Sequence, residues 1–216
     1  MFRLLCILLG YALGCVQSAY IIGKLTRGID IREHGSKNSG FTNANRVMGF
    51  KVGVWIFIAD VGKAVLAFLI ACWLFDGSGS FMAAGVNGLI PGVWAGLGVV
   101  LGHNFPVFLK FRGGKGIACT IGLLLMLDWR AALIIYLIAF LLVLITRYIS
   151  VASLAITFFM PVSMAIFVFM ALEPHAWEVV AVTAFLGVLG WYMHRENIQR
   201  LFSGTERKFS LKSKPL

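Results

Sequence analysis

The chain has 216 residues, of which 60% are hydrophobic and 13% are charged, and its mean hydropathy is +0.89. A soluble domain is roughly half apolar and a quarter charged, so this chain has too little polar surface for a water-soluble globule and is predicted to lie in a membrane. The net charge of +10 does not indicate a nucleic-acid partner, because the basic residues lie in loops between apolar segments, as the positive-inside rule describes.

Seven apolar segments follow one another along the chain, and a helix needs about 20 such residues to cross the hydrocarbon core. They predict an all-α, polytopic transmembrane helical bundle of about seven helices at residues 2–25, 52–75, 81–109, 117–127, 131–146, 150–172 and 176–193. The first segment resembles a signal peptide, but its apolar run continues to Ile22, so we interpret it as a retained helix. The fourth and fifth segments are short and form either two half-depth helices or one bent span interrupted at residues 128–130.

The distribution of positive charge predicts the orientation. Lysines and arginines concentrate at residues 26–51, after the third segment, after the fifth segment and in the C-terminal tail. The opposite side carries Arg3 and Arg130, together with Asp76, Asp128, Glu173 and Glu178. Loops rich in basic residues are predicted to be cytoplasmic, which after seven crossings places the N-terminus outside (periplasmic) and the C-terminus in the cytoplasm. Residues 1–206 are predicted to form a single transmembrane domain, and residues 207–216 a basic cytoplasmic tail.

A charged pair lies inside the second segment. Asp60 and Lys63 are three residues apart, which places them on one face of a helix. Isolated charges at that depth are costly, so we interpret them as a structural ion pair in preference to a catalytic dyad.

The first polar cluster, residues 35–46, combines small hydroxyl and amide residues with glycines and Arg46, and it contains no carboxylate. Glycines expose backbone N–H groups, hydroxyls and amides add donors, and arginine forms paired hydrogen bonds to phosphate. The composition indicates a phosphate-binding loop, although an ordinary polar loop can have the same composition.

The second polar cluster, residues 102–116, begins with a Gly-His pair and ends in a Gly-Gly-Lys-Gly run. This run resembles a phosphate-binding loop, because glycines let backbone amides turn toward an anion and lysine supplies charge. It is not a Walker A loop, since Leu109 stands where the first glycine belongs and Gly116 replaces the Ser/Thr that binds magnesium. The cluster therefore indicates phosphate binding without nucleotide hydrolysis.

The third polar cluster, residues 194–206, follows the last apolar segment and contains His194, Asn197, Arg200 and Glu206. In a helix, residues three apart share a face, so the first three of these side chains would lie together. A helix end with snorkelling basic side chains is the plainer interpretation, and the presence of the other two clusters favours a site.

Together the three clusters resemble the motifs of the bacterial acyl-phosphate:glycerol-3-phosphate acyltransferases, the PlsY family. The matching patterns are G-S-x-N-x-G-x-T-N from residue 35, G-H-x-x-P from residue 102 with F-x-G-G-K-G from residue 111, and H-R-x-N-I-x-R-L-x-x-G-x-E from residue 194. The D-x-x-K pair at residues 60–63 also agrees, and the resemblance spans residues 4–206. Three positions depart from the family pattern. Lys37 stands where glycine or another small residue is common, Phe41 where alanine is common, and Ala64 where glycine is usual.

The resemblance implies transfer of a fatty acyl group from acyl-phosphate to the 1-hydroxyl of glycerol 3-phosphate, which yields lysophosphatidate and inorganic phosphate. It implies an enzyme of the bacterial inner membrane whose active site faces the cytoplasm, with these two substrates and membrane lipid as partners and no nucleic acid. We expect no metal or cofactor, because the histidines are scattered and no cluster of Cys, His or carboxylate residues has ligand spacing.

The resemblance also implies site residues. The catalytic candidates are His194, Asn197 and Ser36, with His194 as the general base; alternatively, a substrate phosphate oxygen takes the proton. The candidates for binding substrate phosphate are Ser36, Asn38, Thr42, Asn43, Arg46, His103, Gly113, Gly114, Lys115, Gly116, Arg200 and Glu206. For His103, a local hydrogen bond at a helix end is an equal alternative.

Two other functions fit parts of the sequence. An acyltransferase that uses acyl-CoA or acyl-carrier protein would carry a His-x4-Asp pair, but the residues five positions after the four histidines are Ser39, Phe108, Val180 and Gln199. A membrane transporter or channel for a phosphorylated anion is compatible with Asp60 and Lys63. Against it, the polar clusters are predicted on one face of the membrane instead of along a path through it, and the two halves show no inverted repeat.

Overall fold

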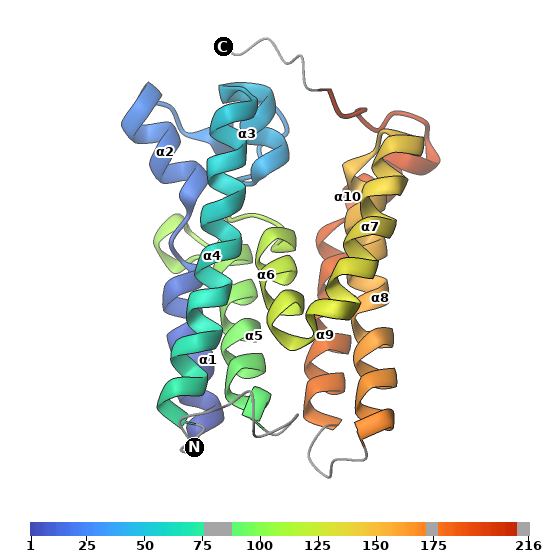
Figure 1. The fold of residues 1–216 in the computed structure, drawn as a ribbon. Helices are drawn as coiled ribbons and strands as arrows, with labels where there is room; N and C mark the ends of the chain where they lie inside the picture. The colour runs from blue at the N-terminus through green and yellow to red at the C-terminus, as the bar shows by residue number, and fades with distance from the viewer. Residues whose placement is uncertain (76–87, 172–176, 211–216) are drawn as a thin grey trace.

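The computed structural model describes residues 1–75, 88–171 and 177–210, and every regular element in these ranges is a helix (Figure 1). The α-helices are α1 (Phe2–Gly14), α2 (Ser18–Arg27), α3 (Phe41–Met48), α4 (Phe50–Phe75), α5 (Ile90–Asn104), α6 (Ile117–Leu127), α7 (Trp129–Thr146), α8 (Ile149–Ala171), α9 (Trp177–Met193) and α10 (Arg195–Phe202). Two short 3-10 helices, η1 (Ile31–Glu33) and η3 (Val107–Leu109), lie in the loops. The predicted all-α fold is confirmed.

Five helical segments in the described residues are long and apolar enough to span a membrane: Phe2–Arg27, Phe50–Phe75, Ile90–Leu109, Trp129–Thr146 and Ile149–Met170. Two shorter apolar helices, α6 and α9, complete the seven predicted segments. The predicted start of the third segment and the predicted tail beyond residue 210 lie outside the described residues, as do Asp76 and Glu173. The chain is therefore a polytopic helical membrane protein, as its sequence predicts.

The first predicted helix, at residues 2–25, lies in a segment long and apolar enough to span a membrane, but the helix is interrupted. α1 ends at Gly14, and α2 begins after Gln17, whose φ and ψ angles of −97° and 89° are not helical. At this break, the carbonyl oxygens of Gly14 and Val16 accept hydrogen bonds from Lys63 Nζ of α4, at 3.2 and 2.7 Å. A membrane helix can be interrupted where other protein groups satisfy the freed backbone, and Lys63 does so here.

The fourth and fifth segments form two separate helices, α6 and α7, and not one bent span. Only α6 has the predicted half depth, because α7 is long and apolar enough to cross the membrane. Asp128 lies between them, and its carboxylate accepts hydrogen bonds from the backbone N–H groups of Arg130 and Ala131, which caps the start of α7. α6 has 11 residues. This length corresponds to a rise of about 16 Å, or about half of the hydrocarbon core. In Figure 1 the turn between α6 and α7 accordingly lies short of the level at which α4 ends.

Glycines bring α1 and α5 into direct backbone contact. A Cβ atom on Gly10 would lie 2.0 Å from the carbonyl oxygen of Ala95, and one on Gly98 would lie 2.2 Å from the carbonyl oxygen of Ile7. Small residues at such positions let membrane helices approach closely. This contact holds the second polar cluster, which starts at the end of α5, close to the break that follows α1.

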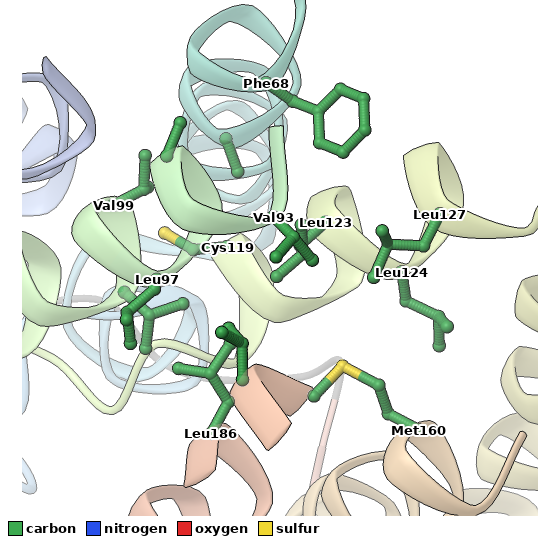
Figure 2. Packing of buried hydrophobic residues seen from close by; sticks show 14 of the residues in the cluster. Phe68, Val93, Leu97, Val99, Cys119, Leu123, Leu124, Leu127, Met160 and Leu186 are labelled. Atoms are coloured by element: carbon green, nitrogen blue, oxygen red, sulfur yellow. The ribbon is translucent and has the colours of Figure 1, made fainter. Parts of the chain in front are cut away.

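Figure 2 shows the apolar interior, where side chains from several helices meet. Buried members of this cluster come from α4, α5, α6, α8 and α9: Phe68, Val93, Leu123, Met160 and Leu186. Many large apolar side chains of α7 are instead exposed, which suits a helix that faces lipid. The shared core fixes the relative positions of the helices that lead to the three polar clusters.

The two ends of the bundle differ in composition. The first and third polar clusters lie at the same end, opposite the N-terminus (Figure 1), which we call the polar end. At the other end Arg3 of α1 and Glu178 of α9 form an ion pair, with Arg3 Nε 2.7 Å from Glu178 Oε2. The tail begins at the polar end, where the Phe209 N–H group donates to the carbonyl oxygen of Arg147 at 2.7 Å.

Candidate active site

Asn43 shapes the first polar cluster from within. Its Oδ1 accepts a hydrogen bond from the Ser36 backbone N–H group at 2.7 Å, and its Nδ2 donates to the carbonyl oxygens of Ile31 and His34. The side chain is fully buried. The family resemblance implies Asn43 as a phosphate ligand. In the structure, Asn43 instead supports the shape of the loop.

This support leaves other side chains of the cluster accessible. Gly35 lies directly against the Asn43 amide with a φ angle of +63°, and a Cβ atom there would be 2.3 Å from Oδ1, so glycine is required. Ser36 is exposed, while Asn38 and Thr42 are half-buried. These three side chains are therefore at least partly accessible in the loop and the first turn of α3.

The two departures from the family pattern in this cluster are accommodated. The Phe41 ring packs against other rings, with centroids 5.9 Å from Phe57, 6.5 Å from Phe50 and 6.2 Å from Phe209. Lys37 has a φ angle of +60°, a conformation that glycine adopts without strain. Phe41 thus joins α3 to α4 and to the tail, and Lys37 keeps the backbone shape of a glycine.

The second polar cluster folds back on the end of α5. The N–H groups of Gly113 and Gly114 donate to the carbonyl oxygens of Asn104 and His103, at 3.1 and 2.9 Å. A Cβ atom on Gly114 would lie 2.1 Å from His103 Nε2, so this close contact requires glycine. The sequence predicts that these two backbone amides face an anion. In the structure, both amides instead donate to the protein's own carbonyl groups. Their role here is to pack the loop that carries Lys115.

Lys115 connects the second cluster to the third. Gly116, with a φ angle of +79°, turns the chain into α6 directly after it. The Lys115 Nζ donates to Asn197 Oδ1 of α10, and Asn197 Nδ2 donates in turn to Glu206 Oε1 at 2.7 Å. Arg200 Nε donates to Glu206 Oε2, also at 2.7 Å. The structure thus brings four predicted site residues into one hydrogen-bonded network.

Positive charge accumulates around this network. Burial, followed by repulsion from Arg200, lowers the pKa of the Lys115 ammonium to about 8. The pKa of Arg46 of α3 is also lowered, first by burial and then by Arg207 and Arg200. Arg46 therefore lies within electrostatic range of Arg200 and Arg207, and the chain that follows the third cluster contacts the first cluster through the rings of Phe209 and Phe41. Cations that raise each other's energy in this way favour an anion bound between them.

His194 lies at the junction of α9 and α10 and is almost completely buried. Its Nδ1 is 2.8 Å from the carbonyl oxygen of Gly190. Since a carbonyl oxygen can only accept, Nδ1 carries the proton and Nε2 keeps a free lone pair. Burial, followed by the charge of Lys115, lowers the pKa of His194 to about 4. The ring is therefore neutral at neutral pH, and Nε2 is able to accept a proton.

The predicted ion pair in α4 is confirmed, with Lys63 Nζ 2.9 Å from Asp60 Oδ1 and both side chains buried. His103 Nδ1 lies 2.9 Å from the same Nζ and accepts from it, because an ammonium group can only donate. Its ring therefore belongs to a buried network between α4 and α5. This differs from both predicted roles of His103, a substrate contact and a local hydrogen bond at a helix end.

Two residues near the site were not among the predicted ones. Ser150, in the first turn of α8, is buried near the Glu206 carboxylate. The sequence feature that could have indicated Ser150 is its hydroxyl group, three residues after the basic loop residue Arg147. Gln17 lies at the break in the first apolar segment, and a lone amide in such a segment was the available signal. In the described parts of the chain, no group of three or more His, Cys, Asp or Glu side chains is placed to hold a metal ion.

The fold and the site define a polytopic helical membrane protein with a convergent set of cationic and hydrogen-bonding groups at one end. Residues 4–204 match the family model described as glycerol-3-phosphate acyltransferase. The glycerol-3-phosphate acyltransferase of Thermoanaerobacter sp. (strain X514) is 37% identical over 215 residues, covering 99% of this chain and 98% of the relative. That of Halalkalibacterium halodurans is 39% identical over 203 residues, covering 94% and 93%. The chain belongs to the glycerol-3-phosphate acyltransferase family.

Two solved structures have the same fold. Both are crystal structures of PlsY, an integral membrane glycerol 3-phosphate acyltransferase. The glycerol 3-phosphate form has a TM-score of 0.80 and 34% identity over 96% of both chains. The lysophosphatidic acid form has a TM-score of 0.78 and 33% identity, over 98% of this chain and 97% of that one.

Proposed function

We propose that this protein transfers a fatty acyl group from acyl-phosphate to the 1-hydroxyl of glycerol 3-phosphate. The hydroxyl oxygen attacks the acyl carbonyl carbon, the bond from that carbon to the phosphate oxygen breaks, and lysophosphatidate and inorganic phosphate are released. The observation that carries this proposal is the hydrogen-bonded network that joins Lys115 of the second cluster to Asn197, Glu206 and Arg200 of the third, with Arg46 of the first within electrostatic range. The names of the relatives support the acceptor substrate.

The charge of the site suits this pair of substrates. Both substrates carry a phosphate group, so the site must hold two anions close together. We assign phosphate binding to Ser36, Asn38, Arg46, Lys115 and Arg200. Cations and donors that are already fixed in a partly buried site stabilise developing charge more than water does, because they need no reorganisation during the reaction.

The proton of the acceptor hydroxyl has two possible destinations. His194 Nε2 is neutral and free to accept it, and Asn197, held between Lys115 and Glu206, would orient the hydroxyl. Alternatively, a phosphate oxygen of the substrate takes the proton. In both routes the leaving phosphate departs among the cations of the site.

The location follows from the charge distribution. We infer that the protein lies in the bacterial inner membrane with its polar end toward the cytoplasm, because basic residues gather at that end and basic loops face the cytoplasm. The acyl chain of the donor then stays among the apolar helices, while both phosphate groups reach the site from the cytoplasmic side.

The test measures lysophosphatidate and phosphate released by purified protein that is given glycerol 3-phosphate with palmitoyl-phosphate and, separately, with palmitoyl-CoA. We expect turnover with the acyl-phosphate alone. Lys115→Ala should reduce it about 100-fold, as the loss of one charge-stabilising group does in other sites. The matched control is Lys51→Ala, an exposed lysine in the first turn of α4, which should stay within about twofold of the wild type.

Each alternative result has a clear meaning. Turnover with palmitoyl-CoA alone would show that the acyl donor is acyl-CoA and not acyl-phosphate. If folded protein gives no product with either donor, the proposed acyltransferase activity is overturned. Flux of glycerol 3-phosphate or phosphate into liposomes without chemical turnover would then favour the transporter.

A further inference from the structure

Gln17 lies at the break between α1 and α2 and bonds in two directions. Its Nε2 donates to the carbonyl oxygens of Gly14 at 3.3 Å and of His103 at 3.1 Å. Its Oε1 accepts a hydrogen bond from Ser39 Oγ at 3.0 Å. Gln17 and Ser39 are only 2% and 1% exposed, so water does not compete effectively for these hydrogen bonds.

Two of the three partners, Ser39 and His103, belong to the polar clusters that are proposed to bind phosphate. Ser39 is part of the first polar cluster. The His103 carbonyl oxygen that accepts from Gln17 also accepts from the Gly114 N–H group at 2.9 Å, and Gly114 directly precedes Lys115. One side-chain amide therefore connects the first cluster to the loop that presents Lys115.

The break from which Gln17 projects is itself anchored. Lys63 Nζ donates to carbonyl oxygens on both sides of Cys15 and pairs with Asp60. Ser18 Oγ donates to Asp60 Oδ1 at 3.0 Å. These bonds attach the start of α2 and the end of α1 to α4, so the backbone of Gln17 is a fixed point between the two loops.

We propose that Gln17 is a positioning residue that sets the spacing between the first polar cluster and the loop of Lys115. The inference rests on the proposed acyl transfer, in which these two loops hold the phosphates of the two substrates. Reacting atoms must approach to about 3–3.5 Å, and a misplacement of about 1 Å can cost about 100-fold in rate. Each loop keeps its own phosphate contacts when the link is lost, so the loss falls on kcat and not on KM.

The experiment compares Gln17→Met, which keeps the side-chain length and removes all three hydrogen bonds, with Ser39→Ala and with the double variant. The readouts are kcat, the KM of each substrate and the thermal unfolding midpoint of the full chain in detergent. We expect each single variant to lower kcat about tenfold, with both KM values within about twofold. The double variant should be no slower than Gln17→Met, because residues that act through one bond are not additive.

Trp94→Phe is the control, because it removes a hydrogen bond from Trp94 Nε1 to the Glu178 carboxylate at 2.8 Å, at the end of the bundle opposite the two loops. It should lower the unfolding midpoint and leave kcat within about twofold. Unchanged kcat in Gln17→Met, additive losses in the double variant, or an equal fall of kcat in Trp94→Phe would overturn the positioning role. If Gln17→Met does not fold, Ser39→Ala measured against Trp94→Phe decides. If the folded wild type shows no turnover, the proposed acyl transfer itself is overturned. If the wild type is active and the losses in the variants are additive, only the positioning role of Gln17 is overturned.

Discussion

Lys115 is the residue at which burial and charge act most directly on the proposed chemistry. Its ordinary pKa of 10.5 falls to about 8, because the ammonium is largely buried and faces Arg200. A lysine with this pKa is mostly charged at neutral pH and loses its charge within the experimentally accessible range. The strength of the phosphate site is therefore expected to depend on pH.

We expect kcat/KM for acyl-phosphate to fall as pH rises through about 8, because the free enzyme then loses the Lys115 charge. The assay is the phosphate-release measurement repeated across pH. In Lys115→Arg the guanidinium stays charged at every usable pH, so the fall should disappear even though the different shape lowers the rate. The same fall in both proteins would show that another group titrates.

His194 provides a second test at the residue scale. We expect His194→Ala to lower kcat about 100-fold, within the usual range for a general base. Because its pKa is about 4 and not the ordinary 6.5, the wild-type kcat should show no inflection from His194 near pH 6.5. Full turnover in His194→Ala would assign the proton to a substrate phosphate oxygen.

At the scale of elements, the pairing of α1 with α5 decides where the second cluster lies. The two helices touch through backbone atoms at Gly10 and Gly98, so the end of α5 is held beside the break after Gly14. Lys63 of α4 satisfies that break and also contacts His103 of α5. Three helices thus meet at one buried polar network directly beneath the loop of Lys115.

We expect Gly98→Ala to lower the free energy of unfolding by about 1–3 kcal/mol, the usual cost of overpacking, because its Cβ atom would lie 2.2 Å from the carbonyl oxygen of Ile7. Gly62→Ala on α4 is the matched control, since nothing lies within 4 Å of its Cβ position. Thermal unfolding of both variants in detergent measures the difference. Equal midpoints would contradict the close contact between α1 and α5.

The whole molecule separates its chemistry from its hydrophobic body. The core of α4, α5, α6, α8 and α9 lies below the polar end, and the exposed apolar face of α7 is suited to lipid. Arg3 and Glu178 pair at the opposite end, so the starts of α1 and α9 lie together there. The proposed orientation places this pair outside and the three clusters in the cytoplasm.

Labelling with a membrane-impermeant maleimide tests this orientation. The native cysteines Cys6, Cys15, Cys72 and Cys119 are buried, so the background should be low. We expect Trp177→Cys to react in cells with an intact inner membrane, and Ser203→Cys to react only after that membrane is opened. Both positions are exposed; Trp177 begins α9, the last apolar helix, and Ser203 follows α10 at the polar end. The reverse pattern would invert the orientation and place the site outside.

Much of the fold and part of the site could be predicted from the sequence. The apolar segments identify the helices, because hydropathy and length are properties of contiguous residues. The structure brings the third cluster and Lys115 together, because Lys115 bonds to Asn197, which bonds to Glu206, which in turn accepts from Arg200. The supporting role of Asn43 and the paired amides of Gly113 and Gly114 could not be predicted, because the sequence does not show which donors are already bonded.

Composition and local spacing were enough to predict that the chain spans a membrane, which segments are helical and that residue types suited to phosphate gather in three clusters. They could not show that the first helix breaks at residues 15–17, that His103 joins Asp60 and Lys63, or that Gln17 links two loops. These features depend on the folded chain, because a buried carbonyl or amide must find a partner, and that partner comes from a segment far away in the chain.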